Sequence, residues 1–163
     1  MKEKLRLYIK ENYEKPVFMK VCMASLGKEA YSYDECAYNA DINTFIKQKD
    51  EYNDFQTMLF KLIDEKNLKD SDVYNKVHID RRLFSKIRSD NNYHPSKETI
   101  ILLGLSLELN EKEIEDLLDS ASYSLPKNNY YDLIIRFCFI NKIYKLTEVN
   151  SLLDEYKCKL FSY

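Results

Sequence analysis

Glycine and proline are scarce in this chain, with only two glycines and three prolines among 163 residues. Turns between β-strands favour glycine, proline and asparagine, so this scarcity argues against a sheet-rich fold. Leucine, isoleucine, lysine and glutamate are abundant, and such a composition favours helices. Hydrophobic residues make up 45% of the chain, enough for a buried core. We therefore expect an all-α fold.

Long apolar runs are also missing. No run of about 18 apolar residues occurs, so we expect no membrane span. The charged N-terminus, "MKEKLRLYIKENYEK", lacks an apolar signal core, which predicts a cytoplasmic protein. The net charge is −2, whereas a protein that wraps a duplex is strongly basic. Any nucleic-acid surface must therefore be a local patch.

Residues suited to metal binding or catalysis are few and scattered. The cysteines form no CxxC pair and lie at no metal-ligand spacing from the histidines. These residues are Cys22, Cys36, Cys138, Cys158, His78 and His94. No Ser/His/Asp or Cys/His set is apparent, and acidic pairs such as Glu113 and Asp116 lie on a predicted surface helix. We expect reduced thiols, no metal, no cofactor and no enzymatic activity.

Apolar spacing predicts most of the helices. Residues 3–14 can form one, and an amphipathic helix begins after Asp54. Its apolar positions are Phe55, Met58, Leu59, Leu62 and Ile63. Residues 17–54 have no steady period and read as a linker. Residues 133–140, "LIIRFCFI", favour a helix by length, with a buried strand as the alternative. A last helix is expected to be capped at Thr147.

Polar residues in front of apolar stretches predict where other helices begin. The candidate N-caps are Asp70 or Ser71, Asp80 and Ser96. Asn110, three residues before Glu113, resembles a capping box. Gly104 lies within a helix whose apolar stripe is Ile100, Leu103 and Leu107. Glycine there costs about 1 kcal/mol relative to alanine, so we expect it to permit a close helix crossing.

The stretch "HIDRRLFSKIRSD", residues 78–90, carries a basic face and an apolar face on one short helix. Its cations are Arg81, Arg82, Lys86 and Arg88, interleaved with Leu83, Phe84 and Ile87. Another helix ends only a few residues earlier, and a tight helix pair with a basic second member is typical of a helix-turn-helix. The alternative is a solvated helix whose cations pair locally with residues such as Asp80 or Asp90.

The stretch "LFKLIDEKNLKDSDVYNKVHIDRRLFSKIRSDNNYHPSKETIILLGLSLELNEKEIEDLL" resembles the phage-repressor-like helix-turn-helix domain (Cro/cI, also called XRE). "PSKETIILL" matches the start of that family's fourth helix and "LNEKEIEDLL" its fifth. The residues that match its second and third helices are Leu68, Val73, Ile79, Phe84, Ser85 and Ile87. The resemblance implies a five-helix repressor-like bundle over residues 55–125. Residues 1–54 would be an N-terminal helix and linker or docking arm, and residues 126–163 a C-terminal helical pair packing on the bundle.

More closely, the chain from Asp54 onward resembles an uncharacterised bacterial helix-turn-helix family found alone or appended to macro (ADP-ribose-processing) and other effector domains. The cores that carry this resemblance are "RRLFSKIRS" and "PSKET". The chain lacks the glycine-rich phosphate loops that a macro domain needs. The resemblance therefore implies a regulatory or accessory module.

The same resemblance implies that the helix at residues 80–90 reads DNA. Arg81, Arg82 and Lys86 match positions that reach base edges, where such side chains can bond to guanine O6 and N7. Arg88 would contact a DNA phosphate. Lys69, at the start of the second helix, would contact the DNA backbone. The implied DNA-binding set is Lys69, Arg81, Arg82, Ser85 (matching a small residue), Lys86 and Arg88.

Several residues depart from the family pattern. Asp70 stands where the family has a phosphate-contacting glutamine, and Asp72 adds a second negative charge. Tyr74 replaces a small residue, and Leu83 stands where a polar residue is common. Such changes suit a helix-turn-helix that contacts protein.

Two functions are therefore expected. The first is a DNA-binding transcriptional regulator, dimeric through the segment 133–140 or the N-terminal extension. The second is a non-catalytic adaptor that binds a partner protein and no DNA.

Charge is distributed unevenly along the predicted bundle. Residues 76–88 carry five cations and one carboxylate, a net +4. Residues 96–119 carry two lysines and seven carboxylates, a net −5. This polarity would steer the basic helix toward DNA, or would favour head-to-tail self-association.

Overall fold

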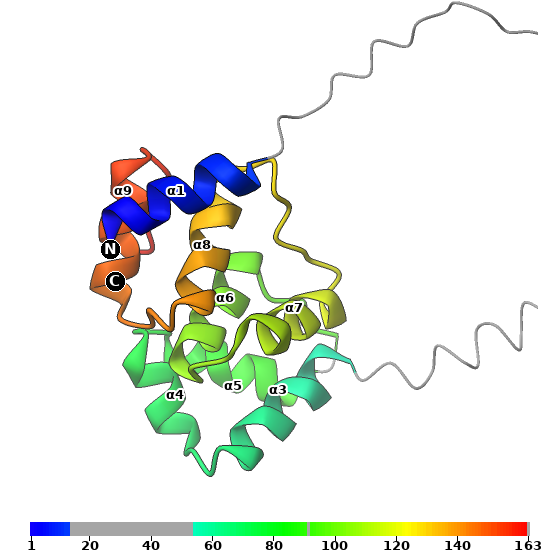
Figure 1. Cartoon of the computed structure of the whole chain (residues 1–163). Coiled ribbons are helices and arrows are strands. Elements are labelled where there is room, and N and C mark those ends of the chain that lie inside the picture. Colours follow the sequence, from blue (N-terminus) through cyan, green and yellow to red (C-terminus); the bar gives the residue numbers. More distant parts are fainter. Residues whose placement is uncertain (14–53, 91, 163) are drawn as a thin grey trace, which may run out of the picture. The chain divides into compact units, whose positions relative to one another are not determined.

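The computed structural model describes residues 1–13, 54–90 and 92–162. Within those residues it contains eight α-helices and no β-strand (Figure 1), which confirms the predicted all-α class. None of these described helices has both the length and the apolar character needed to cross a membrane. The helices are α1 (Lys2–Asn12), α3 (Phe55–Glu65), α4 (Asp70–Lys76), α5 (Arg81–Ser89), α6 (Lys97–Ser106), α7 (Glu111–Ser120), α8 (Tyr130–Ile140) and α9 (Leu146–Glu155).

The periodic segments form the helices that their spacing predicts. Leu5 and Ile9 of α1 are buried, and the segment 133–140 lies within α8, so the helix prevails over the strand alternative. The predicted linker, residues 17–54, lies outside the described residues except for Asp54. The predicted boundaries after residues 54 and 125 stay predictions. In space, α1 and the helices from α3 to α9 form one compact unit.

Helix α6 is buried over most of its surface, and only its first three residues and Leu102 are partly exposed. Ile100, Ile101, Leu103 and Leu105 are all fully inaccessible to solvent, so the apolar surface extends well beyond the predicted stripe. A helix that is apolar beyond its first turn must be covered by other elements. Here α4 and α7 pack on α6, and α7 in turn packs on α3 and α8.

Gly104 allows α6 to approach its neighbours closely, as predicted. A Cβ atom at this position would lie 2.5 Å from Cδ1 of Ile114 in α7 and 3.2 Å from Cζ of Phe139 in α8. The first distance is shorter than any real van der Waals contact, so a larger residue would force the Ile114 side chain or the helix itself to move.

Helix starts follow the predicted caps at three positions. The Asp80 carboxylate accepts from the Arg82 amide at 2.6 Å, and the Ser96 hydroxyl accepts from the Thr99 amide at 3.2 Å. Asn110 and Glu113 form the capping box.

Two predicted caps are wrong. Helix α4 begins with Asp70 itself and has Lys69 as its N-cap, while the Asp70 carboxylate pairs with Arg88. Helix α9 begins at Leu146, which is buried in the core, so Thr147 lies inside the first turn.

Six helices end in the same way, and none of them uses glycine. Each is followed by a residue in the left-handed region, with φ between 51° and 59°. These residues are Asn67, His78, Glu108, Ser122, Lys142 and Lys157. After α8, for example, the Lys142 amide donates to Phe139 O at 3.2 Å and the Ile143 amide donates to Cys138 O at 2.8 Å. This pair of bonds is a Schellman motif, whose left-handed position is usually glycine because a Cβ atom costs about 1–2 kcal/mol there.

Helix α8 joins α6 through a buried ion pair. Lys97 Nζ, in the first turn of α6, lies 2.5 Å from Oδ1 of Asp132, whose side chain is only 3% exposed. Burial raises the pKa of the Asp132 carboxyl above its ordinary value, and the Lys97 ammonium opposes that rise without cancelling it.

The segment 133–140 is core, and the prediction that it offers a dimer surface is wrong. Its apolar side chains are inaccessible or nearly so, apart from Ile140 at 42% exposure. They are covered from within the chain, since α1, α7 and α9 all pack on α8. Arg6 of α1 also pairs with Glu155 of α9 at 2.7 Å.

Replacing Lys142 by glycine should stabilise the protein. The exposed Lys142 side chain is held at φ 55°, which glycine adopts without strain. After the greater entropy of an unfolded glycine is deducted, we expect the free energy of unfolding to rise by about 0.5–1 kcal/mol in urea denaturation. Lys142→Ala is the control, because it removes the side chain but keeps the Cβ atom. If Lys142→Gly and Lys142→Ala were equally stable, the left-handed conformation of residue 142 would not strain the chain, contrary to the prediction.

Replacing Asp132 by asparagine should change how stability depends on pH. Because its pKa is raised on folding, the folded state binds the Asp132 proton more tightly than the unfolded chain does. The wild type should therefore gain stability relative to Asp132→Asn as the pH falls from about 7 toward about 4. Urea unfolding across this range measures the gap. The exposed carboxylate of Asp116 provides the matched control, Asp116→Asn. The prediction is refuted if the free energy of unfolding of the wild type, relative to that of Asp132→Asn, stays constant or decreases as the pH falls.

Candidate nucleic-acid interface

Four residues, Val77 to Asp80, separate α4 from α5. His78 takes the left-handed conformation, and the Ile79 amide donates back to Tyr74 O at 2.9 Å, closing the end of α4. Ile79 is buried, and Asp80 caps α5. The turn is therefore held by its backbone bonds at one end, its cap at the other and a buried side chain between them.

The inner face of α5 is anchored by aromatic packing. Phe84 and Ile87 are 3% and 2% exposed. The Phe84 ring lies 5.6 Å from the Tyr74 ring and 6.2 Å from the Phe60 ring, measured between centroids. Because this face is buried against α3 and α4, the opposite face of α5 must point to solvent.

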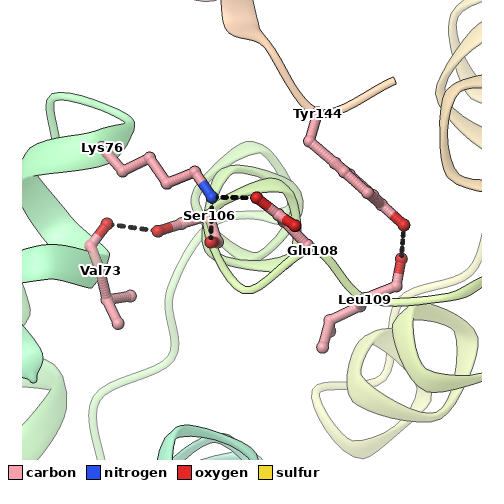
Figure 2. A network of polar contacts seen from close by, with 6 residues as sticks. All are labelled: Val73, Lys76, Ser106, Glu108, Leu109 and Tyr144. Carbon is pink, nitrogen blue, oxygen red and sulfur yellow. Dashed lines mark hydrogen bonds and ion pairs between the residues drawn. The ribbon is translucent and has the colours of Figure 1, made fainter. Parts of the chain in front are cut away.

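Helix α4 is held on α6 by a buried hydrogen bond. The Ser106 hydroxyl donates to Val73 O at 2.6 Å, and Lys76 Nζ donates to Ser106 O at 3.2 Å (Figure 2). Lys76 also pairs with Glu108 at 2.5 Å. In the same view the Tyr144 hydroxyl donates to Leu109 O at 3.0 Å. The turn after α6 is thus bonded both to α4 and to the loop between α8 and α9.

All six predicted DNA-binding residues are exposed, and they lie around α5 and the start of α4. Lys69 immediately precedes α4, and the others are on α5. Four of the six line one hollow of about 570 Å³ between α3, α4 and α5: Lys69, Arg81, Ser85 and Arg88. Arg82 and Lys86 are not among its lining residues, and Lys86 Nζ instead lies 4.4 Å from the centroid of the Tyr93 ring.

The cations of α5 differ in how far their charge is compensated. The Arg88 guanidinium pairs with Asp70 at 2.6 Å and lies 4.1 Å from the centroid of the Phe60 ring. Among the described residues, no carboxylate pairs with Arg81 or Arg82. Lys86, in the last turn, also has no carboxylate partner among these residues, so Arg88 is the compensated cation of α5.

Gln56 is a positioning residue that the sequence analysis missed. Its side-chain amide, at the start of α3, donates to Ile87 O and Arg88 O at 2.7 Å each. These carbonyls belong to the last turn of α5, where partners from within the helix are lacking. No local signal reveals this bond, because the two partners are 31 and 32 residues from Gln56.

Ser106 also positions a neighbouring helix, α4, and its role could have been predicted from the sequence. It is the one hydroxyl in the otherwise apolar run "IILLGLSL", and a buried hydroxyl needs a partner.

Comparison of the chain with known protein families, with characterised proteins and with solved structures found no match.

Replacing Ser106 by alanine should destabilise the protein, because the buried Val73 carbonyl loses its donor. We expect the free energy of unfolding to fall by about 1–3 kcal/mol. The control is Ser120→Ala, which removes a similar bond of 2.7 Å, to Leu117 O, at a part-buried site. Chemical denaturation of both variants measures the difference. An equal loss in the two would show that Ser106 has no special part in holding α4.

Proposed function

We propose that this protein binds double-stranded DNA through α5 and acts as a regulator of transcription. The observation that carries the proposal is the set of exposed cations on the first two turns of α5, opposite an anchored apolar face. An α-helix fits the major groove of B-form DNA, where base edges are read. A helix with one rigidly packed side and one basic side suits that task.

Under this proposal α4 and α5 are the two members of a helix-turn-helix. Their short connection, with its left-handed residue and buried Ile79, supports this reading. So does the order of the five helices α3 to α7, in which α4 packs on both α5 and α6. Helices α1, α8 and α9 would then be additions that support the bundle from the other end.

Individual side chains of α5 have separate proposed roles. Arg81 and Arg82 stand in its first turn, and an arginine there can form two hydrogen bonds with guanine O6 and N7. Lys86 is one turn further on, with its ammonium over the Tyr93 ring. Ser85 keeps the middle of this face small. Lys69, which precedes α4, would contact a phosphate.

Charge on the rest of the bundle would orient the approach of DNA. Helix α7 carries five carboxylates and one lysine. With a net charge of −2 overall, attraction to a duplex is limited to the α5 surface. The acidic helix would repel phosphate.

A specific feature favours a second candidate, a protein-binding adaptor. The hollow beside α5 has apolar walls from Ile63, Leu68 and Phe84, and it also contains the carboxylates of Asp64 and Asp70. Apolar walls with charges of both signs suit a peptide better than a polyanion. Failure to bind DNA would therefore move the assignment to this function.

The test is fluorescence anisotropy of a labelled mixed-sequence duplex at about 50 and 200 mM salt, a range over which phosphate contacts weaken strongly. The wild type should bind with steep salt dependence. Arg81→Ala combined with Lys86→Ala should lower affinity about tenfold or more. The matched control is Lys10→Ala with Lys112→Ala, two exposed cations on α1 and α7, which gives the same change in net charge.

Equal weakening by the two double variants would show that only total charge matters and that α5 is not the interface. If the wild type does not bind at the lower salt concentration, DNA binding is refuted. The partner should then be sought by affinity capture, with Leu68→Asp as the variant of the hollow, because Leu68 is exposed.

A further inference from the structure

Asp70 stands beside the proposed DNA-binding surface. It is the first residue of α4, and its carboxylate lines the same hollow as Arg81, Ser85 and Arg88. A duplex that reaches Arg81 must therefore pass close to this negative charge. Asp70 is the only carboxylate on this surface that pairs with a cation of α5 among the described residues.

The ion pair between Asp70 and Arg88 is open to solvent and to ligands. The two side chains are 37% and 51% exposed. Three groups locate the last turn of α5 around Arg88: the Asp70 carboxylate, the Phe60 ring beneath the guanidinium, and the Gln56 amide on the backbone carbonyls. Since Phe60 and Gln56 would remain, the guanidinium would stay near its present position if the carboxylate were removed.

We infer that Asp70 limits the affinity of α5 for the DNA backbone, by neutralising Arg88 and by placing a negative charge where a phosphate would approach. This inference rests on the proposed DNA-binding function. Contacts with phosphate supply affinity that does not depend on sequence. Asp70 therefore lowers binding to every duplex, and a larger share of the remaining affinity comes from base contacts by Arg81, Arg82 and Lys86.

The test compares wild type, Asp70→Asn, Arg88→Ala and the double variant on a short labelled duplex of mixed sequence, by anisotropy from about 50 to 200 mM salt. Asp70→Asn should bind about tenfold more tightly at the lower salt concentration. The slope of log affinity against log salt should steepen by about 0.9, the value for one additional phosphate contact. Adding Arg88→Ala should abolish most of this gain, because Arg88 is the cation that the substitution releases.

Asp72→Asn is the matched control. It makes the same change of charge two residues further along α4, at an exposed position that does not line the hollow. Its affinity should change less than twofold. Circular dichroism and melting temperature show whether each variant folds, and Asp70→Ser replaces Asp70→Asn if the latter melts at a lower temperature than the wild type.

The outcomes separate this inference from the proposed function. If the wild type binds DNA and Asp70→Asn binds no more tightly than Asp72→Asn, the role of Asp70 is refuted while DNA binding stands. If the gain persists without Arg88, the neutralisation of Arg88 is refuted, and the repulsion of phosphate by Asp70 alone accounts for the gain. If no protein in the set binds at the lower salt concentration, both the function and the role of Asp70 are overturned.

Discussion

The burial of most of α6 is the constraint on which the rest of this unit depends. A helix that is apolar beyond its first turn has little surface for solvent, so its neighbours must cover it. Each is attached differently: α4 by the buried hydroxyl of Ser106, α7 across the small surface of Gly104, and α8 through the ion pair of Lys97 with Asp132. The α5 surface is built outward from this centre. Its basic side faces solvent because its other side rests on α3 and α4, and α4 in turn is bonded to α6.

The sequence predicted the helices and several of their starts, because both depend on residues close together in the chain. The caps at Asp80 and Ser96 bond to amides within three residues, so they can be predicted from the sequence. Asp70 was predicted as a cap but is the first helical residue, and the partner of its carboxylate lies 18 residues away, beyond the reach of a local pattern. Helix ends were harder to predict still. Their usual marker is glycine, but here residues as ordinary as His78 and Lys142 occupy the left-handed position.

The sequence predicts which cations of α5 are exposed, but it does not predict which of them are paired with a carboxylate. The exposed cations of α5 follow from their spacing against Phe84 and Ile87, which must face the core. Spacing cannot distinguish Arg88, which is paired and stacked, from Arg81, which has no carboxylate partner among the described residues. That distinction needs the positions of α3 and α4. It separates Arg88, which is compensated, from Arg81, Arg82 and Lys86, which have no carboxylate partner in the described part of the chain.

The six left-handed helix ends without glycine have a consequence for how this protein can change. Each is a separate site where one substitution would relieve strain of about 1 kcal/mol, and effects at distant sites are roughly additive. Most changes on a binding surface cost stability, and a protein loses its fold once the accumulated loss passes a threshold. A lineage that acquired glycine at a few of these ends could tolerate substitutions on α5 that the present chain could not. The helix termini therefore influence how many substitutions on α5 this fold can tolerate.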